Sequence, residues 1–173
     1  SNDRKGSIVK FDVNQYMCYM DQFKWYMDDG NIEISSENKV KDNEGIYLEG
    51  PEFISINPKQ DSLRFFAPKA RFDLKKFIIY AKEVQYILVA DAKIFPDSGK
   101  VEIHKKAEMQ PLTNAKIIAN SVTKYHTLHA CNVNIYGRLS YQASGNYDYV
   151  DELKKKNTIY FSSVTVDTTG QTF

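Results

Sequence analysis

One spacing of apolar residues recurs along the chain. An apolar residue is followed three positions later by a small or β-branched residue, and two positions after that by a large apolar one. Successive copies start 22, 23 and 18 residues apart, and a looser fifth copy follows. The copies are Ala67-x-x-Ala70-x-Phe72, Val89-x-x-Ala92-x-Ile94, Leu112-x-x-Ala115-x-Ile117, Ala130-x-x-Val133-x-Ile135 and Phe161-x-x-Val164-x-Val166. Because side chains alternate between the faces of a strand, this pattern predicts stacked strands that share a narrow core of small and large residues.

Alternating apolar and polar residues extend over most of the chain after residue 45. The strand-like runs are short and are broken by residues typical of turns, such as Gly50-Pro51 and Pro96-Asp97-Ser98-Gly99. At five or six residues per strand, this predicts about ten or more strands. We therefore expect a mainly all-β fold of stacked strands. The spacing fits either a folded-over antiparallel sheet, such as a jelly roll, or a parallel β-solenoid.

The first 35 residues follow a different pattern. Asp12 can cap a helix, Gln15 stands three residues later, and apolar residues follow at helical spacing, which predicts a short helix over residues 13–22. Alternating residues on both sides of a turn at 28–31 predict a hairpin, although the helix could instead continue to Met27 and stop at Gly30. Residues 35–44 are polar. We expect an N-terminal appendage over 1–35 and a stacked β domain over 45–173 that is part of a longer chain.

Composition narrows the functional classes. An apolar content of 42% is typical of a globular chain, and 23 basic residues against 22 acidic ones argue against nucleic acid as a partner. No apolar run is long enough for a transmembrane helix. The two cysteines, Cys18 and Cys131, could pair or remain as buried free thiols.

The run from Leu63 to Asp73, Leu-Arg-Phe-Phe-Ala-Pro-Lys-Ala-Arg-Phe-Asp, resembles the OstA-like domains of lipopolysaccharide transport. Stretches such as Tyr47-Leu-Glu-Gly50 and Asp91-Ala92 are similar to large uncharacterised cell-envelope proteins of Bacteroidetes. The resemblance covers about residues 45–135. It implies a periplasmic or outer-membrane-associated β domain with open edges, which handles lipid or assembles with neighbouring β modules of the same chain or of another envelope protein.

Residues that could carry chemistry are few. His126-x-x-His129-x-Cys131 has the donor atoms of a zinc site, but strand alternation would place His126 on the other face from the remaining two. Acidic residues at 148–152 have no fixed separation that would suit a glycosidase. We therefore predict no catalytic residue, no metal site and no cofactor.

Aromatic residues near turns and in alternating runs are the candidate ligand-binding residues. They are Trp25, Tyr26, Tyr141, Tyr147 and Tyr149. Such rings can stack on sugars or line an apolar groove. We expect a non-enzymatic structural or interaction module of a bacterial cell-envelope protein, able to accept lipid acyl chains or glycolipid in an apolar groove. The alternative is a carbohydrate-binding β module that uses exposed Trp and Tyr.

Overall fold

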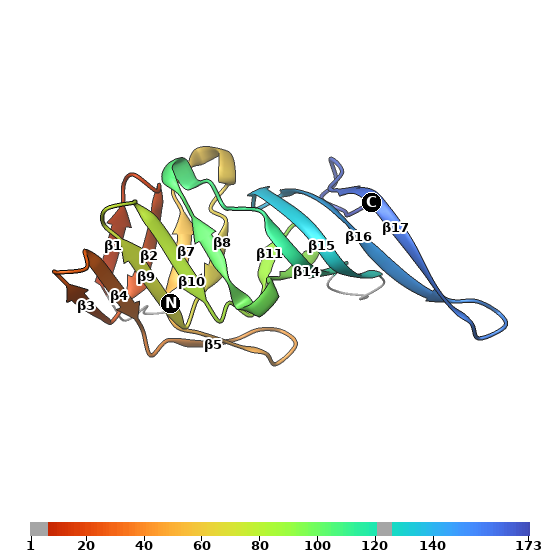
Figure 1. The fold of residues 1–173 in the computed structure, drawn as a ribbon, viewed down its shortest axis with the longest axis horizontal. Helices are drawn as coiled ribbons and strands as arrows, with labels where there is room; N and C mark the ends of the chain where they lie inside the picture. The colour runs from red at the N-terminus through yellow and green to blue at the C-terminus, as the bar shows by residue number, and fades with distance from the viewer. Residues whose placement is uncertain (1–6, 121–125) are drawn as a thin grey trace.

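The computed structural model describes residues 7–120 and 126–173, and within them the protein is mainly β with every strand pair antiparallel (Figure 1). Sheet A has the order β1 (Ser7–Phe11), β2 (Tyr16–Met20), β7 (Glu52–Ser55), β8 (Arg64–Phe66). Sheet B has the order β13 (Val101–Ile103), β10 (Ile78–Lys82), β9 (Lys69–Asp73), β4 (Asn31–Ser35), β3 (Gln22–Tyr26). Sheet C is the hairpin of β5 (Lys39–Lys41) and β6 (Tyr47–Glu49). Sheet D has the order β11 (Ile87–Val89), β12 (Ala92–Phe95), β14 (Leu112–Ala119), β15 (His126–Gly137), β16 (Ser140–Val150), β17 (Lys156–Thr165).

The predicted N-terminal helix over residues 13–22 is wrong. The chain turns at Asp12–Gln15, where Gln15 has a positive φ of 53°, and continues as strand β2. Tyr16, Cys18 and Met20 are buried on alternate positions, so the period is two and not 3.6. Helical structure in the described ranges is confined to three short 3₁₀ turns, η1 (Pro58–Gln60), η2 (Asp97–Gly99) and η3 (Lys105–Ala107). The predicted hairpin is confirmed, because β3 pairs with β4.

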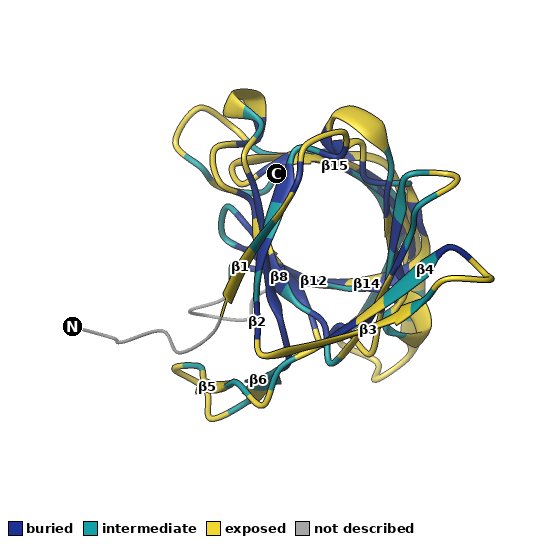
Figure 2. Cartoon of the chain, turned by 90° about the vertical axis from the view of Figure 1, so that its left-hand side faces the viewer, coloured by how far each residue is buried: buried dark blue, intermediate teal, exposed yellow. Residues whose placement is uncertain are grey.

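Sheets A and B face each other across one hydrophobic core. Figure 2, viewed along the long axis, shows buried residues lining the inside of both sheets. Phe11 of sheet A and Phe72 of sheet B bring their ring centroids to 4.8 Å. The recurring small and large residues fill this interior and its continuation under sheet D, since Ala70, Phe72, Ala92, Ile94, Ala115, Ile117, Val133 and Ile135 are all buried. The predicted small and large core is therefore confirmed.

Sheet D continues the molecule away from sheets A and B (Figure 1). The last residues run back from β17 to the turn between β11 and β12. There, the backbone N–H and the hydroxyl of Thr172 donate to Asp91 Oδ1 at 3.1 and 2.6 Å, and the Thr172 hydroxyl lies 2.8 Å from the hydroxyl of Tyr141. The C-terminal segment thus ties one edge of sheet D to the strands at the other.

Both cysteines are buried and unpaired. Cys18 lies in sheet A and Cys131 in sheet D, and burial raises the pKa of their thiols to about 12 and about 11. Both thiols therefore stay protonated near neutral pH and act as small apolar core residues.

Candidate functional site

The hairpin of β16 and β17 projects from the body of the protein as an arm (Figure 1). Its outer strand, β17, is an edge strand of ten residues, Lys156–Thr165, and it pairs with no other strand of the described chain than β16. Lys156 is its only charged residue. At its centre stand three consecutive apolar residues, Ile159, Tyr160 and Phe161, whose exposed fractions are 43%, 64% and 41%.

One face of the arm is apolar. Tyr147 lies directly opposite Ile159, and Gly145 lies opposite Phe161, so these side chains share the face that continues from the core. The rings of Tyr147 and Phe161 meet edge to face with centroids 6.4 Å apart, and the ring of His126 lies 5.9 Å from that of Tyr147. These contacts hold the aromatic side chains in place while leaving them half exposed.

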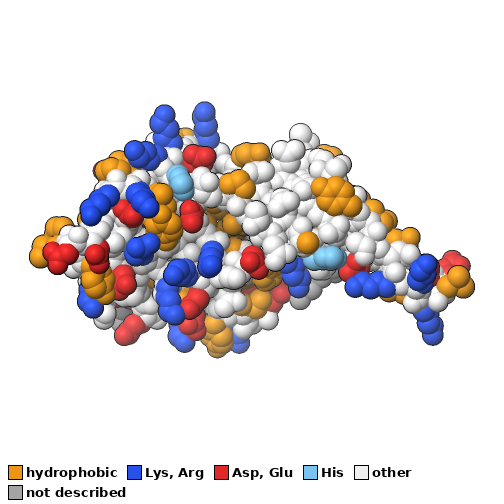
Figure 3. All heavy atoms as spheres, in the orientation of Figure 1, with side chains coloured by type: hydrophobic (Ala, Val, Ile, Leu, Met, Phe, Trp, Pro, Cys, Tyr) orange, Lys and Arg blue, Asp and Glu red, His pale blue; other side chains and the backbone are white. Residues whose placement is uncertain are grey.

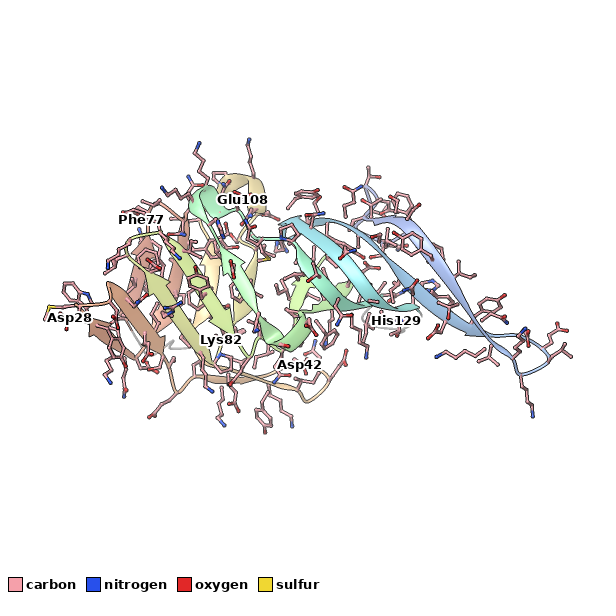
Figure 4. The ribbon with its side chains drawn as sticks, in the orientation of Figure 1. Asp28, Asp42, Phe77, Lys82, Glu108 and His129 are labelled. Atoms are coloured by element: carbon pink, nitrogen blue, oxygen red, sulfur yellow. The ribbon has the colours of Figure 1, made fainter. Side chains whose placement is uncertain are left out.

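The opposite face of the arm is held by a polar cluster around Asp148. Its carboxylate accepts a hydrogen bond from the Thr158 hydroxyl at 2.5 Å, and it pairs with Lys156 Nζ at 2.9 Å and with His129 Nε2 at 3.0 Å. Figure 4 labels His129. The hydrogen bond from Thr158, followed by that from Lys156, holds the pKa of Asp148 well below its usual range. The cluster joins β15, β16 and β17, so it fixes their register and orients the apolar face.

A bulge and a glycine shape the base of the arm. Between the pairs Ala143–Val164 and Gly145–Phe161, β17 has one residue more than β16. A Cβ at Gly145 would collide with Cys131 Sγ, so only glycine lets β16 pass this buried thiol. Beyond the bulge, Thr165 exchanges two backbone hydrogen bonds with Phe173, at 3.1 and 3.0 Å. The open edge of β17 therefore ends at Thr165, and its regular part is residues 156–161.

The five aromatic residues predicted to bind a ligand do not form one site. Trp25 and Tyr26 lie on opposite faces of β3, at the far end of the molecule from β16 (Figure 1). Tyr141 is buried, whereas Tyr147 and Tyr149 share the apolar face of the arm. The prediction missed Ile159, Tyr160 and Phe161. Their signal in the sequence is an unbroken apolar triplet within an otherwise alternating run.

The histidines and acidic residues of this region have local partners. A positive φ of 49° at Ala130 marks a break in the pairing of β15, so His129 stays exposed beside Asp148 while Cys131 is fully buried. The expectation that His129 and Cys131 share a face is therefore wrong. Asp151 accepts hydrogen bonds from the amides of Leu153 and Lys155 in the turn of the arm. In the part of the chain that the structure describes, no group of three metal-binding residues occurs.

Comparison with known proteins gives no relative. No protein-family model, no curated protein sequence and no solved structure matches the chain. Across residues 7–120 and 126–173, none of the helical segments has the length and apolarity to cross a membrane.

Proposed function

We propose that this protein is a non-enzymatic assembly module that joins a second copy of itself, edge to edge, through β17. The observation that carries the proposal is the composition of this edge. Unpaired edge strands in stable monomers are usually short, charged or interrupted, because a regular apolar edge recruits other strands. Over residues 156–161, β17 has one charge, no proline and no bulge, and its centre is apolar on both faces.

The strand is complementary to itself. In an antiparallel pair around a twofold axis at Tyr160, Ile159 of each copy lies opposite Phe161 of the other, within the regular part of the strand. The single charge, Lys156, is then far from its own copy, so no like charges meet. Apolar and aromatic cross-strand pairs each contribute about 0.2–1 kcal/mol, in addition to the backbone ladder. The two sheets D would form one continuous sheet with a shared apolar face.

The first test is sedimentation velocity over about a hundredfold range of protein concentration, since self-association depends on concentration. We expect a monomer–dimer equilibrium. Tyr160→Lys would place two lysines opposite each other on the twofold axis and should raise the dissociation constant at least about tenfold. Tyr136→Lys is the matched control, because Tyr136 is similarly exposed but lies on β15, inside the sheet. A protein that stays monomeric throughout, or a dimer that is indifferent to Tyr160→Lys, contradicts the proposal.

A cysteine at the axis tests the register itself. Tyr160→Cys should form an intermolecular disulfide under mild oxidation, because directly opposed residues bring their Cβ atoms within about 5.5 Å. Tyr136→Cys should not. The native thiols do not interfere, since both are buried.

The narrower predictions from the sequence remain predictions. They comprise the jelly-roll type, the OstA-like relationship, the bacterial envelope as location, the binding of acyl chains or of sugars by Trp and Tyr, and the division at residues 35–45. The parallel β-solenoid does not agree with the structure, because the strand pairs of the described residues are antiparallel. An edge-to-edge module agrees with the expectation of neighbouring β modules as partners.

A further inference from the structure

The outer face of sheet B has a groove of about 530 Å³ that is rich in cations. Four cationic side chains line it, Lys24, Lys69, Arg71 and Lys82, and the single carboxylate among its lining residues is Glu33. Figure 3 shows Lys and Arg side chains interspersed with Asp and Glu over this half of the molecule, and Figure 4 places Lys82 near the end of β10. The whole chain has a net charge of only +1, so the excess of positive charge is local.

The strand register forces like charges together in this groove. Lys69 on β9 and Lys82 on β10 lie directly opposite each other, and Arg71 is two residues along β9 on the same face. Directly opposed like charges destabilise an antiparallel pair. Lys69 is compensated by Glu83, at 2.6 Å, but Lys82 has no carboxylate partner among the described residues. An anion bound in the groove would relieve this repulsion.

Two further contacts hold the cations in position. The Arg71 guanidinium lies over the ring of Tyr80 at 4.9 Å, and Lys24 Nζ lies over the ring of Tyr26 at 4.8 Å. Hydrogen bonding to Tyr26 raises the pKa of Lys24, so this lysine remains charged. The Tyr26 hydroxyl donates to Glu33, which keeps that carboxylate engaged within the sheet. The cations are therefore held in place, and the Tyr26 hydroxyl orients the one acid of the groove, which keeps its charge.

The spacing of the cations indicates a ligand with several acidic groups. Lys24 and Arg71 lie two strands apart in the row Lys24, Glu33, Arg71, Tyr80, with the carboxylate of Glu33 between them. At the usual strand separation these two cations are about 10 Å apart, and residues two apart on one strand, such as Lys69 and Arg71, are about 7 Å apart. A single phosphate could contact only one corner of this array. A chain that carries an acidic group on each unit could contact three or four of the cations at once.

The neutral groups in the groove favour a sugar chain over other polyanions. Gln22 and Ser35 lie opposite each other beside the cations, and the ring of Tyr80 contributes a hydroxyl. Amide and hydroxyl side chains suit the hydroxyl groups of sugars, whereas carboxylates suit the cations. We propose that this groove binds an acidic oligosaccharide, one with a carboxylate or sulfate on successive sugars. The groove is on sheet B and its lining includes no residue of sheet D, so this binding does not depend on assembly through β17.

Isothermal titration calorimetry with tetragalacturonic acid tests the proposal. We expect saturable binding that weakens as salt is added, because exposed charges are screened. The variant Arg71→Gln/Lys82→Gln removes two charges from the groove and should weaken binding at least about tenfold. The matched control, Lys75→Gln/Lys76→Gln, removes two charges from the turn at the far end of the same strand pair and should change the affinity less than about twofold.

Several outcomes would overturn the proposal. They are the absence of binding to tetragalacturonate, an equal loss in both double variants, equal binding of neutral maltotetraose, and equal or tighter binding of inorganic phosphate or of phosphatidylglycerol vesicles. If the double variant Arg71→Gln/Lys82→Gln unfolds, the single variant Lys82→Gln still tests the proposal, because it relieves the repulsion from Lys69. That single variant should melt at the same or a higher temperature than the native protein and still bind tetragalacturonate more weakly. The Tyr160→Lys variant, which disrupts only assembly, should bind as the native protein does.

Discussion

Replacing Lys93 with Met is expected to lower the free energy of unfolding by about 3 kcal/mol or more at pH 7. Lys93 lies on β12 with a side chain only 9% exposed, and its Nζ contacts Asp42 Oδ2 at 3.0 Å and Glu44 Oε1 at 2.9 Å. The two carboxylates belong to the turn between β5 and β6, so this cation attaches sheet C to sheet D (Figure 4). Without it, Asp42 would remain nearly buried beside another acid and would lose its ion pair with Lys93.

The same cluster makes stability depend on pH. Burial alone would raise the pKa of Asp42, but hydrogen bonds from Tyr86, from Lys93 and from the amides of Ile46 and Glu44 outweigh it and lower the pKa to about 2. The ordinary value in an unfolded chain is about 3.9. A lowered carboxyl pKa adds stability above the unfolded value, and this stability is lost as the pH falls from about 4 to about 2. The Lys93→Met variant lacks much of this contribution, so its deficit should shrink over that range.

Urea denaturation followed by circular dichroism at pH 7, 4 and 2.5 measures both effects. Lys100→Met is the matched control, because Lys100 is exposed in the same part of the fold and makes no ion pair with any described residue; it should change stability by less than about 0.5 kcal/mol. Adding Asp42→Asn to Lys93→Met should recover part of the loss, since it removes the uncompensated charge. A deficit that is the same at all three pH values, or no recovery in the double variant, would refute the role of the ion cluster.

The core was predictable from the sequence because its signal is local. Two positions of each repeat, such as Ala92 and Ile94, lie two apart on one strand, so period-two alternation alone places them on the same face. Lys93 shows the limit of this reasoning. Its place between two core residues predicts an exposed side chain on the other face, yet the structure buries it under a turn about fifty residues away. A contact between residues so distant in the sequence cannot be inferred from the local alternation of apolar and polar residues.

Two other errors have a related physical origin. Residues 13–20 contain apolar side chains at both helical and strand spacing, and pairing of β2 with β1 and β7 on its two sides selects the strand. The β17 edge was missed although its residues have a clear sequence signal. Its apolar triplet at Ile159–Phe161 is visible in the sequence, but only the sheet order shows that no described strand covers it. Which strand lies at an edge is decided by the whole fold.

The turn that replaced the predicted helix joins the two facing sheets through one side chain. Asn14 is fully buried, and its Nδ2 donates to the carbonyl oxygens of Phe77 at 2.7 Å, Ile103 at 3.1 Å and His104 at 3.2 Å. These carbonyls lie at the ends of β10 and β13 in sheet B, whereas Asn14 links β1 and β2 in sheet A. Asn14 Oδ1 has no hydrogen-bond partner within the described residues. The hydrogen bonds that link this side chain to sheet B are therefore all donated by its amide nitrogen.

Asn14→Asp is expected to destabilise the protein by about 4 kcal/mol at pH 8, because it replaces the donor with a buried negative charge that faces carbonyl oxygens. That environment should raise the pKa of the new carboxyl above its unfolded value. The penalty should therefore be small below about pH 4, where the group is protonated in both states, and should grow as the pH rises. Asn14→Ala removes the donor without adding a charge, so its deficit of about 3 kcal/mol should not vary with pH. Urea denaturation of both variants at pH 4, 6 and 8 separates the two cases. Parallel pH profiles for the two variants would mean that the new carboxyl reaches solvent. An Asn14→Ala deficit of less than about 1 kcal/mol would mean that Asn14 does not hold sheets A and B together.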